Sequence, residues 1–369
     1  MVALSKRRLH PRERIRVLIV DDSVVIRRLV AHALEQDPQI EVVGSASNGR
    51  VALSKIPHLN PDVITLDIEM PEMNGLEMLD ALRPDYPDVR VVMFSTLTER
   101  GASATLEALS RGADDYVTKA SNVGSLDVSL GNLQDQLLPK IHQFFQPKEE
   151  PSGSGPFFVP TPPSAGAASR RAAVAKAAEV AVIGISTGGP SALSEMLPML
   201  PADFGKPILI VQHMPPLFTR LLAERLDEQT PLPVKEAADG DRVQPGHIYI
   251  APGDYHMRLA STGTDVAIAL DQGPPENSCR PAVDVLFRSA LATYGGAVVA
   301  AVLTGMGQDG MRGTELLRSA GAHIIAQDEA TSVVWGMPGA VANHGLADEI
   351  VPLSEIASCI CRAIATEKR

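Results

Sequence analysis

The sequence predicts an α/β protein of two domains, and three observations support this. Short apolar segments rich in Val and Ile alternate with helix-periodic segments over residues 15–145. The same alternation returns over 179–369, after a stretch, 146–178, in which proline recurs among Gly, Ser and Ala. Strands that alternate with helices are typical of parallel, doubly wound sheets, whereas a Pro-rich stretch of this kind is typical of a linker.

In the first domain, five apolar segments are predicted to form strands, with helical patterns between them. The strands are expected at 16–20, 41–46, 63–67, 89–95 and 115–118. Ser23 follows the first strand and is a suitable N-cap for the next helix, because its hydroxyl can accept a hydrogen bond from the first helical turn. Other helical patterns include 105–110, and the last one covers 126–145.

The second domain repeats this order with longer connections. Strands are expected at 180–185, 207–212, 247–251, 297–303 and 323–326, and helices at 191–199, 218–226, 282–291, 311–320 and 353–365. Two apolar runs around a polar tip at 261–265 predict a β-hairpin over 257–270. The alanine-rich end of the linker is compatible with a short helix. We therefore expect a doubly wound, mostly parallel sheet with an added hairpin.

Composition excludes several classes of protein. The net charge of -11 disfavours a nucleic-acid-binding protein, although residues 1–14 form a basic leader that we expect to be solvated. The leader lacks the apolar core of a secretory signal, and no run reaches the roughly 18 apolar residues that span a bilayer, so no membrane insertion is expected. The 3 cysteines are odd in number and lack zinc spacing. Unpaired thiols fit a reducing, cytoplasmic location.

Carboxylates are expected to cluster at one edge of the first sheet. Asp21 and Asp22 follow the first predicted strand, Asp67 ends the third, and Lys119 follows the fifth. Each alone could cap a helix and face water, but the set favours a Mg²⁺ site held by Asp21 or Asp22, Asp67 and the backbone carbonyl of Glu69. Asp67 can then accept a phosphoryl group as a covalent nucleophile, while Lys119 and the metal neutralise the phosphoryl oxygens.

The same region carries a recognisable pattern. It contains the run Asp67-Ile68-Glu69-Met70-Pro71 and, shortly after it, Asn74-Gly75. With these motifs, residues 15–140 resemble the receiver domain of two-component response regulators. The resemblance implies a flavodoxin-like (βα)5 fold and phosphorylation of Asp67 by a sensor histidine kinase.

The resemblance also assigns a switch. It implies that Ser95 and Tyr116 are the hydroxyl and aromatic positions of the receiver switch, which act together with Lys119. One position departs from the family pattern, because Ala120 stands where a proline usually follows the lysine. That proline is typically cis, so the loop after the fifth strand is expected to differ here.

A glycine-rich turn follows the first strand of the second domain. Gly184-Ile185-Ser186-Thr187-Gly188-Gly189 fits a strand–nucleophile–helix turn, in which small neighbours let Ser186 project beside a helix amino end. The alternative is a nucleotide loop, although the P-loop lysine and the dinucleotide spacing are missing. His213 and Asp309 follow two other strands at the same edge. His213 alone could be structural and Asp309 alone could cap the helix near Met311, but their convergence with Ser186 favours catalysis.

Together these residues predict a serine hydrolase with a catalytic triad. Ser186 would attack an acyl carbon, His213 would pass the hydroxyl proton to the leaving group, and Asp309 would orient the imidazole and stabilise its cation. Backbone N–H groups near Thr187 or Met306 would form the oxyanion hole.

The order of the triad residues separates this site from that of the α/β-hydrolases. Those enzymes have the order Ser…Asp…His, whereas the order here is Ser…His…Asp. The other order would need Asp254 or Asp284 together with His323 or His344. His323 is expected at the start of a strand and His344 near the end of a helix, so neither is well placed.

The second domain resembles the catalytic domain of the chemotaxis protein-glutamate methylesterases. The shared stretches are Gly184–Gly189, Val211-Gln212-His213-Met214, Ala251-Pro252-Gly253-Asp254, Ser278-Cys279-Arg280-Pro281-Ala282-Val283-Asp284-Val285 and Leu303–Gly310. The resemblance implies hydrolysis of glutamate γ-methyl esters, and deamidation of glutamines, on the cytoplasmic helices of methylated chemoreceptors, with no metal or cofactor at the hydrolase site. It also implies that the unphosphorylated receiver covers the catalytic edge and that phosphorylation at Asp67 releases it. Arg280 could steer the acidic receptor surface or form a plain salt bridge.

Two other functions remain compatible with the sequence. One is a response regulator whose second domain only binds a protein partner, although binding alone would not need a Ser/His/Asp set. The other is a general esterase or peptidase joined to a receiver. DNA-binding output is disfavoured, because the second domain lacks a basic recognition helix.

Overall fold

The structure is a computed structural model that describes residues 14–119, 126–145, 178–263 and 265–365. Contacts divide the chain into two compact units, 1–148 and 149–369, each with its own sheet. The loop at Ala120 and the alanine-rich stretch lie outside the described residues. The same holds for nearly all of the predicted leader (1–14) and linker (146–178).

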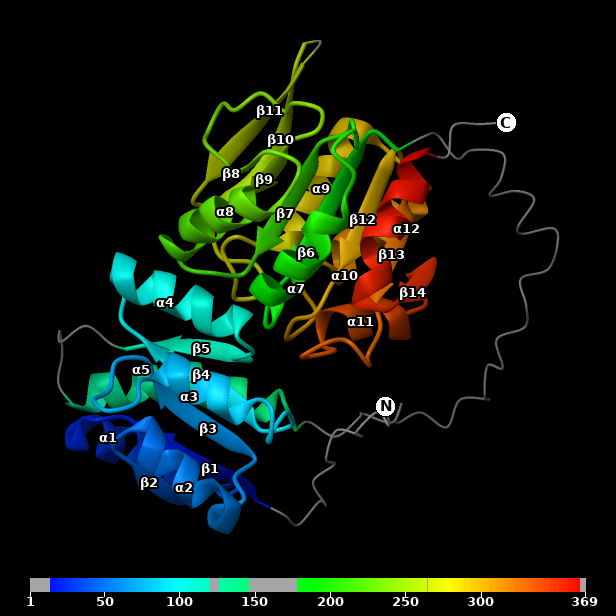
Figure 1. The fold of residues 1–369 in the computed structure, drawn as a ribbon. Helices are drawn as coiled ribbons and strands as arrows, with labels where there is room; N and C mark the ends of the chain where they lie inside the picture. The colour runs from blue at the N-terminus through cyan, green and yellow to red at the C-terminus, as the bar shows by residue number, and fades with distance from the viewer. Residues whose placement is uncertain (1–13, 120–125, 146–177, 264, 366–369) are drawn as a thin grey trace, which may run out of the picture. The chain divides into compact units, whose positions relative to one another are not determined.

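The first unit contains a five-stranded parallel sheet in the order β2-β1-β3-β4-β5 (Figure 1). Its strands are β1 (Ile15–Val20), β2 (Ile40–Ala46), β3 (Val63–Asp67), β4 (Arg90–Ser95) and β5 (Asp115–Thr118). Its helices are α1 (Val24–Glu35), α2 (Gly49–Leu59), α3 (Gly75–Leu82), α4 (Glu99–Ser110) and α5 (Leu126–His142). This is the flavodoxin-like order, which leaves a crevice at the carboxyl ends of β1 and β3.

Local sequence explains where these helices begin. Ser23 Oγ accepts a hydrogen bond from Ile26 N at the start of α1, which confirms the predicted N-cap. Helix α3 begins with a capping box, in which Asn74 accepts from Glu77 N and Glu77 accepts from Asn74 N. Apolar side chains of α1 and α5 then pack against β1 in one buried cluster. The helix caps and the buried cluster together fix the carboxyl edge of the sheet, where Asp21 and Asp67 lie.

The second unit contains a seven-stranded parallel sheet in the order β14-β13-β12-β6-β7-β9-β8. Its strands are β6 (Val180–Ile185), β7 (Ile208–Gln212), β8 (Val234–Glu236), β9 (Ile248–Ile250), β12 (Val298–Val302), β13 (His323–Gln327) and β14 (Glu349–Val351). The predicted hairpin forms a separate antiparallel pair, β10 (His256–Thr262) with β11 (Asp265–Asp271). The predicted α/β fold class with an added hairpin is confirmed.

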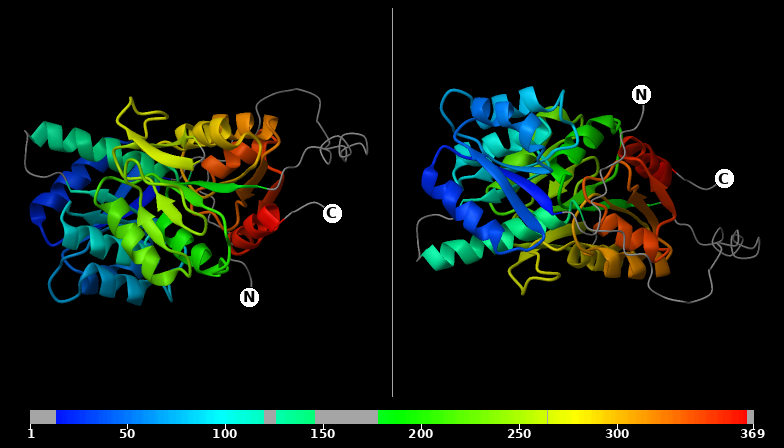
Figure 2. Two further views of the ribbon diagram at one scale, coloured as in Figure 1. Left: turned by 90° about the horizontal axis from the view of Figure 1, so that it is seen from above. Right: turned by 90° about the horizontal axis from the view of Figure 1, so that it is seen from below.

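Helices cover both faces of this sheet. They are α7 (Gly189–Met196), followed by a 3-10 turn (Leu197–Met199), α8 (Phe218–Gln229), α9 (Val283–Tyr294), α10 (Met311–Ser319), α11 (Met337–Asn343) and α12 (Leu353–Ala365). Figures 1 and 2 show α7, α8 and α12 on one face and α9 and α10 on the other. Among the described residues, none of these helices combines the length and apolarity that a membrane span requires.

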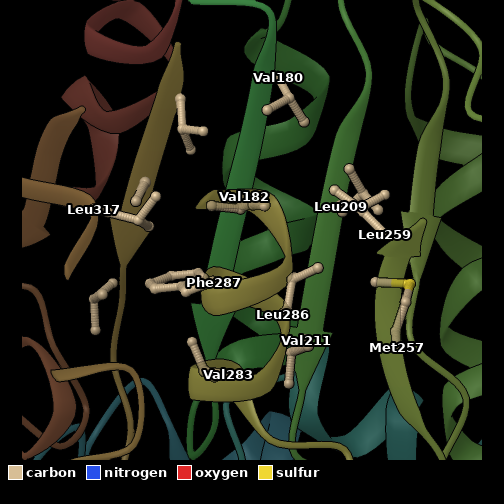
Figure 3. Close-up of a cluster of buried hydrophobic side chains, with 14 of the residues drawn as sticks. Val180, Val182, Leu209, Val211, Met257, Leu259, Val283, Leu286, Phe287 and Leu317 are labelled. Carbon is tan, nitrogen blue, oxygen red and sulfur yellow. The ribbon is translucent and has the colours of Figure 1, made fainter. Parts of the chain in front are cut away.

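A buried apolar cluster anchors α9 against the central strands (Figure 3). Val182 of β6 and Val211 of β7 meet Leu286 and Phe287 of α9, and all four are fully buried. Burying a side chain of this size contributes about 1.5–3 kcal/mol. Packing is so close near the end of β6 that a Cβ on Gly184 would lie 2.4 Å from Val283 Cγ1. The start of α9 is thus held directly beside the turn that carries Ser186.

Some elements of the second unit were not predicted from sequence. Strands β8 and β14 have three residues each, and α11 has seven, so they are too short for a clear hydrophobic period. Helix α7 begins at Gly189 rather than at residue 191, because Gly188 adopts a left-handed conformation and starts the helix. The other strands and helices expected in this unit are present.

Candidate functional site

The predicted catalytic residues follow three neighbouring strands, β12, β6 and β7. Ser186 comes directly after β6, His213 comes directly after β7, and Asp309 lies in the loop between β12 and α10. Backbone hydrogen bonds continue past the strand ends, from Ser186 N to Thr304 O (2.9 Å) and from His213 N to Ile185 O (3.1 Å). The central strands therefore bring three distant segments of the chain to one edge.

Asp309 is a buried carboxylate, 2% exposed, with five hydrogen-bond donors. The donors are His213 Nε2 (2.8 Å), Val283 N (2.7 Å), Asn277 Nδ2 (2.8 Å), Asp284 N (3.1 Å) and Gly310 N (2.9 Å). The N-cap of α10 is Gly310, and no side chain caps this helix, so Asp309 is not a simple helix cap. So many donors hold the carboxylate in one orientation, which suits it to orient an imidazole.

Burial and hydrogen bonding shift the pKa values of this pair. Burial raises the pKa of Asp309, but the hydrogen bond and charge of His213 and the backbone donors outweigh it, so the pKa is lowered. Burial lowers the pKa of His213, but its contacts with Asp309 and Cys279 outweigh this and raise the pKa above 6.5. The stabilisation from His213 is therefore complete below pH 6.5 and is lost as pH rises through the raised pKa.

Ser186 lies on a turn that small residues make possible. Gly188 has a φ of 78°, which an L side chain rarely adopts, and it forms the N-cap of α7. Gln212 Nε2 of β7 donates to Ser186 O (3.0 Å) and so fixes the serine backbone from the neighbouring strand. Ser186 is thus held between the end of β6 and the start of a helix, as the glycine pattern predicts.

Within the described residues, one half of the triad is hydrogen-bonded. His213 Nε2 contacts Asp309, whereas Nδ1 lies 3.6 Å from Cys279 Sγ, and no hydrogen bond joins the ring to Ser186 Oγ. Catalytic hydrogen bonds are often long before substrate binds and tighten in the complex. The hydroxyl–imidazole contact therefore stays a prediction, which requires the Nδ1 side of the ring to turn from Cys279 toward the serine.

A turn that contains one residue missed by the sequence analysis, Asn277, contacts this pair. Asn277 donates to Asp309 and to Asp284, and the Cys279 thiol faces His213. No sequence signal identifies Asn277, because a lone Asn before Ser reads only as turn composition. Arg280 follows in the same loop and donates its Nε to Asp254 Oδ1 (3.0 Å), so the structure gives it a local ion pair.

The two predicted oxyanion-hole residues are Thr187, which directly follows Ser186, and Met306, which lies in the loop after β12. Thr187 is buried, and its carbonyl accepts from Thr304 Oγ1 at 2.9 Å. Met306 is 41% exposed and follows Gly305, where an added Cβ would lie 2.7 Å from Ser186 Cβ. Thr304 is thereby tied to the turn at Ser186 by two hydrogen bonds, and whether the two candidate N–H groups form an oxyanion hole stays a prediction.

Substituting Gly305 with alanine is expected to lower kcat for hydrolysis by about 100-fold while the protein stays folded. The new methyl group would displace Ser186, and a displacement of a reacting group by about 1 Å lowers the rate by about that factor. A Cβ at this position would lie 2.7 Å from Ser186 Cβ and 3.1 Å from Ser186 N. Steady-state kinetics together with thermal unfolding check this. Gly44→Ala is the matched control, since its Cβ would meet only methyl groups of Leu59 and Leu18 in the first unit. Equal kcat for Gly305→Ala and wild type would contradict the close fit.

The alternative histidines are engaged elsewhere. His323 Nε2 contacts Glu349 at 2.8 Å at the start of β13, and His344 Nδ1 contacts Ala340 O at 2.8 Å after α11. Asp254 pairs with Arg280. None of these contacts builds a second dyad, so the order Ser…His…Asp remains the one that the geometry supports.

The predicted phosphoacceptor residues meet at the corresponding edge of the first unit. Oxygens of Asp21, Asp22 and Asp67 lie within 4.8 Å of one another at the ends of β1 and β3. Lys119 follows β5, and its Nζ contacts Asp67 Oδ1 at 2.8 Å and Asp21 Oδ2 at 3.1 Å. Glu69, whose backbone carbonyl is the further predicted ligand, lies in the loop after β3.

The electrostatics of this cluster fit a hard cation. Burial raises the pKa of Asp67, and the ammonium of Lys119 offsets this only in part. Burial lowers the pKa of Lys119, but its contacts with Asp67 and Asp21 outweigh this and raise it. The ammonium of Lys119 contacts two of the three carboxylates, so the cluster keeps excess negative charge on oxygen donors, which is the donor set that Mg²⁺ prefers.

The predicted switch residues are both buried. Ser95 Oγ accepts a hydrogen bond from Thr105 Oγ1 at 2.6 Å, so its hydroxyl is held by α4. Burial raises the pKa of Tyr116, and Lys140 Nζ lies 5.4 Å from the centre of its ring. Thr105 is a further residue that the sequence analysis missed, because the pattern around it predicts a helix but no contact with Ser95.

Known proteins resemble this chain over both units. The family model of the CheB methylesterase matches residues 181–360, and that of the response regulator receiver domain matches 17–130. A protein-glutamate methylesterase/protein-glutamine glutaminase of Trichodesmium erythraeum is 50% identical, over 95% of this chain and 99% of that protein. A Nocardioides protein of the same name is 51% identical, over 96% of each. The crystal structure of the Thermotoga maritima CheB methylesterase catalytic domain is similar, with a TM-score of 0.50 and 44% identity over 51% of this chain and 99% of that one.

Proposed function

The chain belongs to the family of CheB methylesterases that carry a receiver domain, and from this premise we propose how its residues act. It is a protein-glutamate methylesterase and protein-glutamine glutaminase. Its proposed substrates are glutamate γ-methyl esters and glutamines on the cytoplasmic helices of chemoreceptors. The observation that carries the proposal is the 2.8 Å contact between His213 and Asp309, at the ends of the strands beside Ser186.

The reaction proceeds through an acyl-enzyme. Ser186 Oγ attacks the γ-carbonyl carbon while His213 takes the hydroxyl proton, and the imidazolium then returns that proton to the departing methoxide, which leaves as methanol. A water molecule, deprotonated by the same imidazole, releases the glutamate carboxylate and restores the serine. Asp309 stays ionised throughout, orients the imidazole and stabilises its cation.

Deamidation uses the same groups. With a glutamine substrate the acyl-enzyme is identical and the departing group is ammonia, so no second site is required. Backbone N–H groups of Thr187 and Met306 are proposed to stabilise the oxyanion. One such donor typically lowers the activation free energy by about 3 kcal/mol. Methanol release from methylated receptor helices by the full chain tests this function. Absence of release with and without a phosphodonor would reject it.

Phosphorylation of the receiver unit is proposed to control this activity. Asp67 is the proposed phosphoacceptor for a sensor histidine kinase. Phosphoryl transfer from such a kinase takes place in the cytoplasm, so the enzyme is proposed to act there. Asp21, Asp22, Asp67 and the carbonyl of Glu69 would hold the Mg²⁺, which supplies positive charge for the phosphoryl oxygens when bound. Lys119 adds its own charge, supported by its 2.8 Å contact with Asp67.

The switch residues give this unit a way to report its phosphorylation. Ser95 Oγ accepts from Thr105 of α4 and donates to Thr96 O and Gly101 O at 3.2 Å, so it must exchange the donated bond for one to a phosphoryl oxygen. Tyr116 lies on β5, next to β4, which ends at Ser95. A change at Asp67 is therefore proposed to reach α4 through Ser95 and Thr105, and the aromatic position through the neighbouring strand.

Replacing Asp67 with asparagine is expected to remove the stimulation of methanol release by a phosphodonor. The amide keeps the shape of the side chain but cannot form an acyl phosphate. Wild type should be stimulated about 5- to 150-fold, the usual range for coupled sites, whereas the ratio for Asp67→Asn should be close to unity. Initial rates with and without acetyl phosphate and Mg²⁺ measure this ratio.

The matched control is Asp88→Asn. Asp88 is an exposed carboxylate in the loop before β4, at the opposite edge of the sheet, and its replacement should leave the stimulation ratio at the wild-type value. Full stimulation of Asp67→Asn would show that the phosphoacceptor has been assigned to the wrong residue.

A further inference from the structure

A tight turn outside the triad reaches both His213 and Asp309. Glu276 and Cys279 exchange backbone hydrogen bonds (3.1 and 2.9 Å), so Asn277 and Ser278 form the tip. Both tip residues have positive φ, 52° and 63°. Such two-residue tips favour Asn at the first position, because Asn tolerates the left-handed conformation. Asn277 can therefore adopt this backbone conformation without strain. Its side-chain amide is not used inside the turn and is free to bind carboxylates outside it.

The turn is fixed at both ends. Glu276 makes a two-pronged contact with Arg288 of α9, at 2.7 and 2.6 Å. On the other side, Arg280 binds Asp254 and donates to Gly273 O at 2.9 Å. Paired guanidinium–carboxylate contacts restrict orientation as well as distance. The position of the tip relative to α9 is therefore well determined.

From this position the amide of Asn277 bridges two carboxylates. Its Nδ2 donates to Asp309 Oδ1 at 2.8 Å and to Asp284 Oδ2 at 3.0 Å. Both partners are carboxylate oxygens, so only the NH₂ group can face them. Asp284 is fully buried on α9, and its other oxygen accepts from Gly313 N at 2.6 Å. One amide thus supplies both of its protons to a pair of buried acids.

The titratable and charged groups around this pair come from several elements. They are His213 after β7, Cys279 and Glu276 on the turn, Arg288 on α9 and His256 on β10. Burial raises the pKa of Asp284, and the charge of Asp309 raises it further. Two carboxylates this close cannot both stay ionised cheaply unless donors lie between them. Asn277 is the side chain that donates to both.

We propose that Asn277 is a positioning residue of the hydrolase, whose amide keeps Asp309 ionised and aimed at His213 by separating it from Asp284. The proposal rests on the proposed function, since it assumes that His213 and Asp309 act with Ser186. Asn277 acts through Asp309, and Asp284 is the like charge whose effect the amide suppresses.

The sign of the expected pH effect follows from treating His213, Asp309 and Asp284 as one coupled set. Within this set the pKa of His213 is raised and that of Asp309 is lowered, so the first proton goes to His213 and inactivates the enzyme by blocking the imidazole as a base. Without the amide, the two carboxylates repel each other more and the set gains that proton at higher pH. The acid limb of the kcat profile therefore moves to higher pH.

The main test variant is Asn277→Gly in the full chain. Glycine tolerates the positive φ of 52°, so the turn is retained while the amide is lost. We expect the acid limb of kcat for methanol release to move up by about one pH unit, with about a tenfold lower kcat at pH values below it. KM should change little, because Asn277 contacts carboxylates of the protein rather than substrate.

Two further variants separate this role from a merely structural one. Ser278→Gly relaxes the same tip without touching either carboxylate and should keep the wild-type pH profile. Adding Asp284→Asn to Asn277→Gly removes the neighbouring charge and should return the acid limb toward the wild-type position. A structural role predicts instead that losses accumulate in the double variant.

The outcomes are distinct from those that test the triad. If Ser186→Ala is inactive but the acid limb of Asn277→Gly coincides with that of wild type, the inference about Asn277 is wrong and the triad stands. If Ser278→Gly shifts the limb equally, the turn rather than the amide is responsible, and the inference is again wrong. If Ser186→Ala keeps its activity, the proposed function itself fails.

Discussion

Replacing Ser186 with alanine is expected to abolish methanol release from methylated receptor helices. Without the hydroxyl no acyl-enzyme forms, and removal of a triad nucleophile lowers kcat by on the order of 10⁶-fold in a comparable hydrolase. The side chain is half-buried on the turn after β6, and the turn's backbone bonds to Thr304 and Gln212 do not use its hydroxyl. The thermal unfolding midpoint should therefore stay close to that of wild type.

Ser194→Ala is the matched control for this experiment. Ser194 lies on α7, in the helix that starts directly after the Ser186 turn, and it is also partly exposed. Its replacement should leave the rate of methanol release within about twofold, as expected for a surface substitution away from a site. Full activity of Ser186→Ala would remove the nucleophile from the proposed mechanism.

Covalent labelling separates the enzyme from a second domain that only binds a partner. A serine-directed acyl trap should add mass to the peptide that contains Ser186 in wild type, and to no such peptide in Ser186→Ala. The contact between His213 and Asp309, at the end of the strand next to that of Ser186, supports reaction at this serine, because the proposed base would make the hydroxyl nucleophilic. A fully inert wild-type serine would favour the binding module.

The sequence allowed the candidate residues to be placed together because they stand at strand ends. Asp67 closes an apolar strand, and Ser186 and His213 directly follow two others, so the general rule for parallel sheets places each at the carboxyl edge. The strands themselves are strongly apolar and fully buried, which makes their period and their ends easy to recognise. Chemistry and topology thus point to the same edge without any knowledge of tertiary contacts.

Other features depend on contacts that no local pattern encodes. The neighbouring position of β12 and β6, which brings Asp309 to His213, is a pairing between strands far apart in the sequence. The hydroxyl contact of Thr105 with Ser95 and the amide bridge of Asn277 likewise join a common residue type to a distant partner. Such residues have ordinary local sequences, so only the folded structure reveals them.

The pair Asp284 and Asp309 illustrates this limit. Both are buried acids, and both were candidates for the triad carboxylate in one residue order or the other. Their local sequences do not decide between them, since each lies near the start of a helix. The structure does: Asp309 contacts His213 Nε2, whereas Asp284 accepts from Gly313 N and from Asn277.

Replacing Asp309 with asparagine is therefore expected to lower kcat by about 10⁴-fold, with a smaller effect on KM. The amide carries no charge to stabilise the imidazolium that forms when His213 takes the serine proton. Its NH₂ group can also face the ring and favour the wrong tautomer. Loss of the carboxylate removes one of the two contacts that raise the pKa of His213, so that pKa should fall, and imidazole titration by NMR can follow it together with methanol release.

Asp284→Asn is the matched control, because it makes the same carboxylate-to-amide change at a buried site one contact away. The amide oxygen can still accept from Gly313 N. Asp309 keeps its own charge and loses only the repulsion from the carboxylate of Asp284. We therefore expect kcat to stay within about tenfold of wild type, since a shift of one pKa unit corresponds to that factor. Equal losses in the two variants would mean that burial of an acid at this edge, rather than the contact of Asp309 with His213, supports catalysis. A larger loss in Asp284→Asn would instead assign the triad carboxylate to α9.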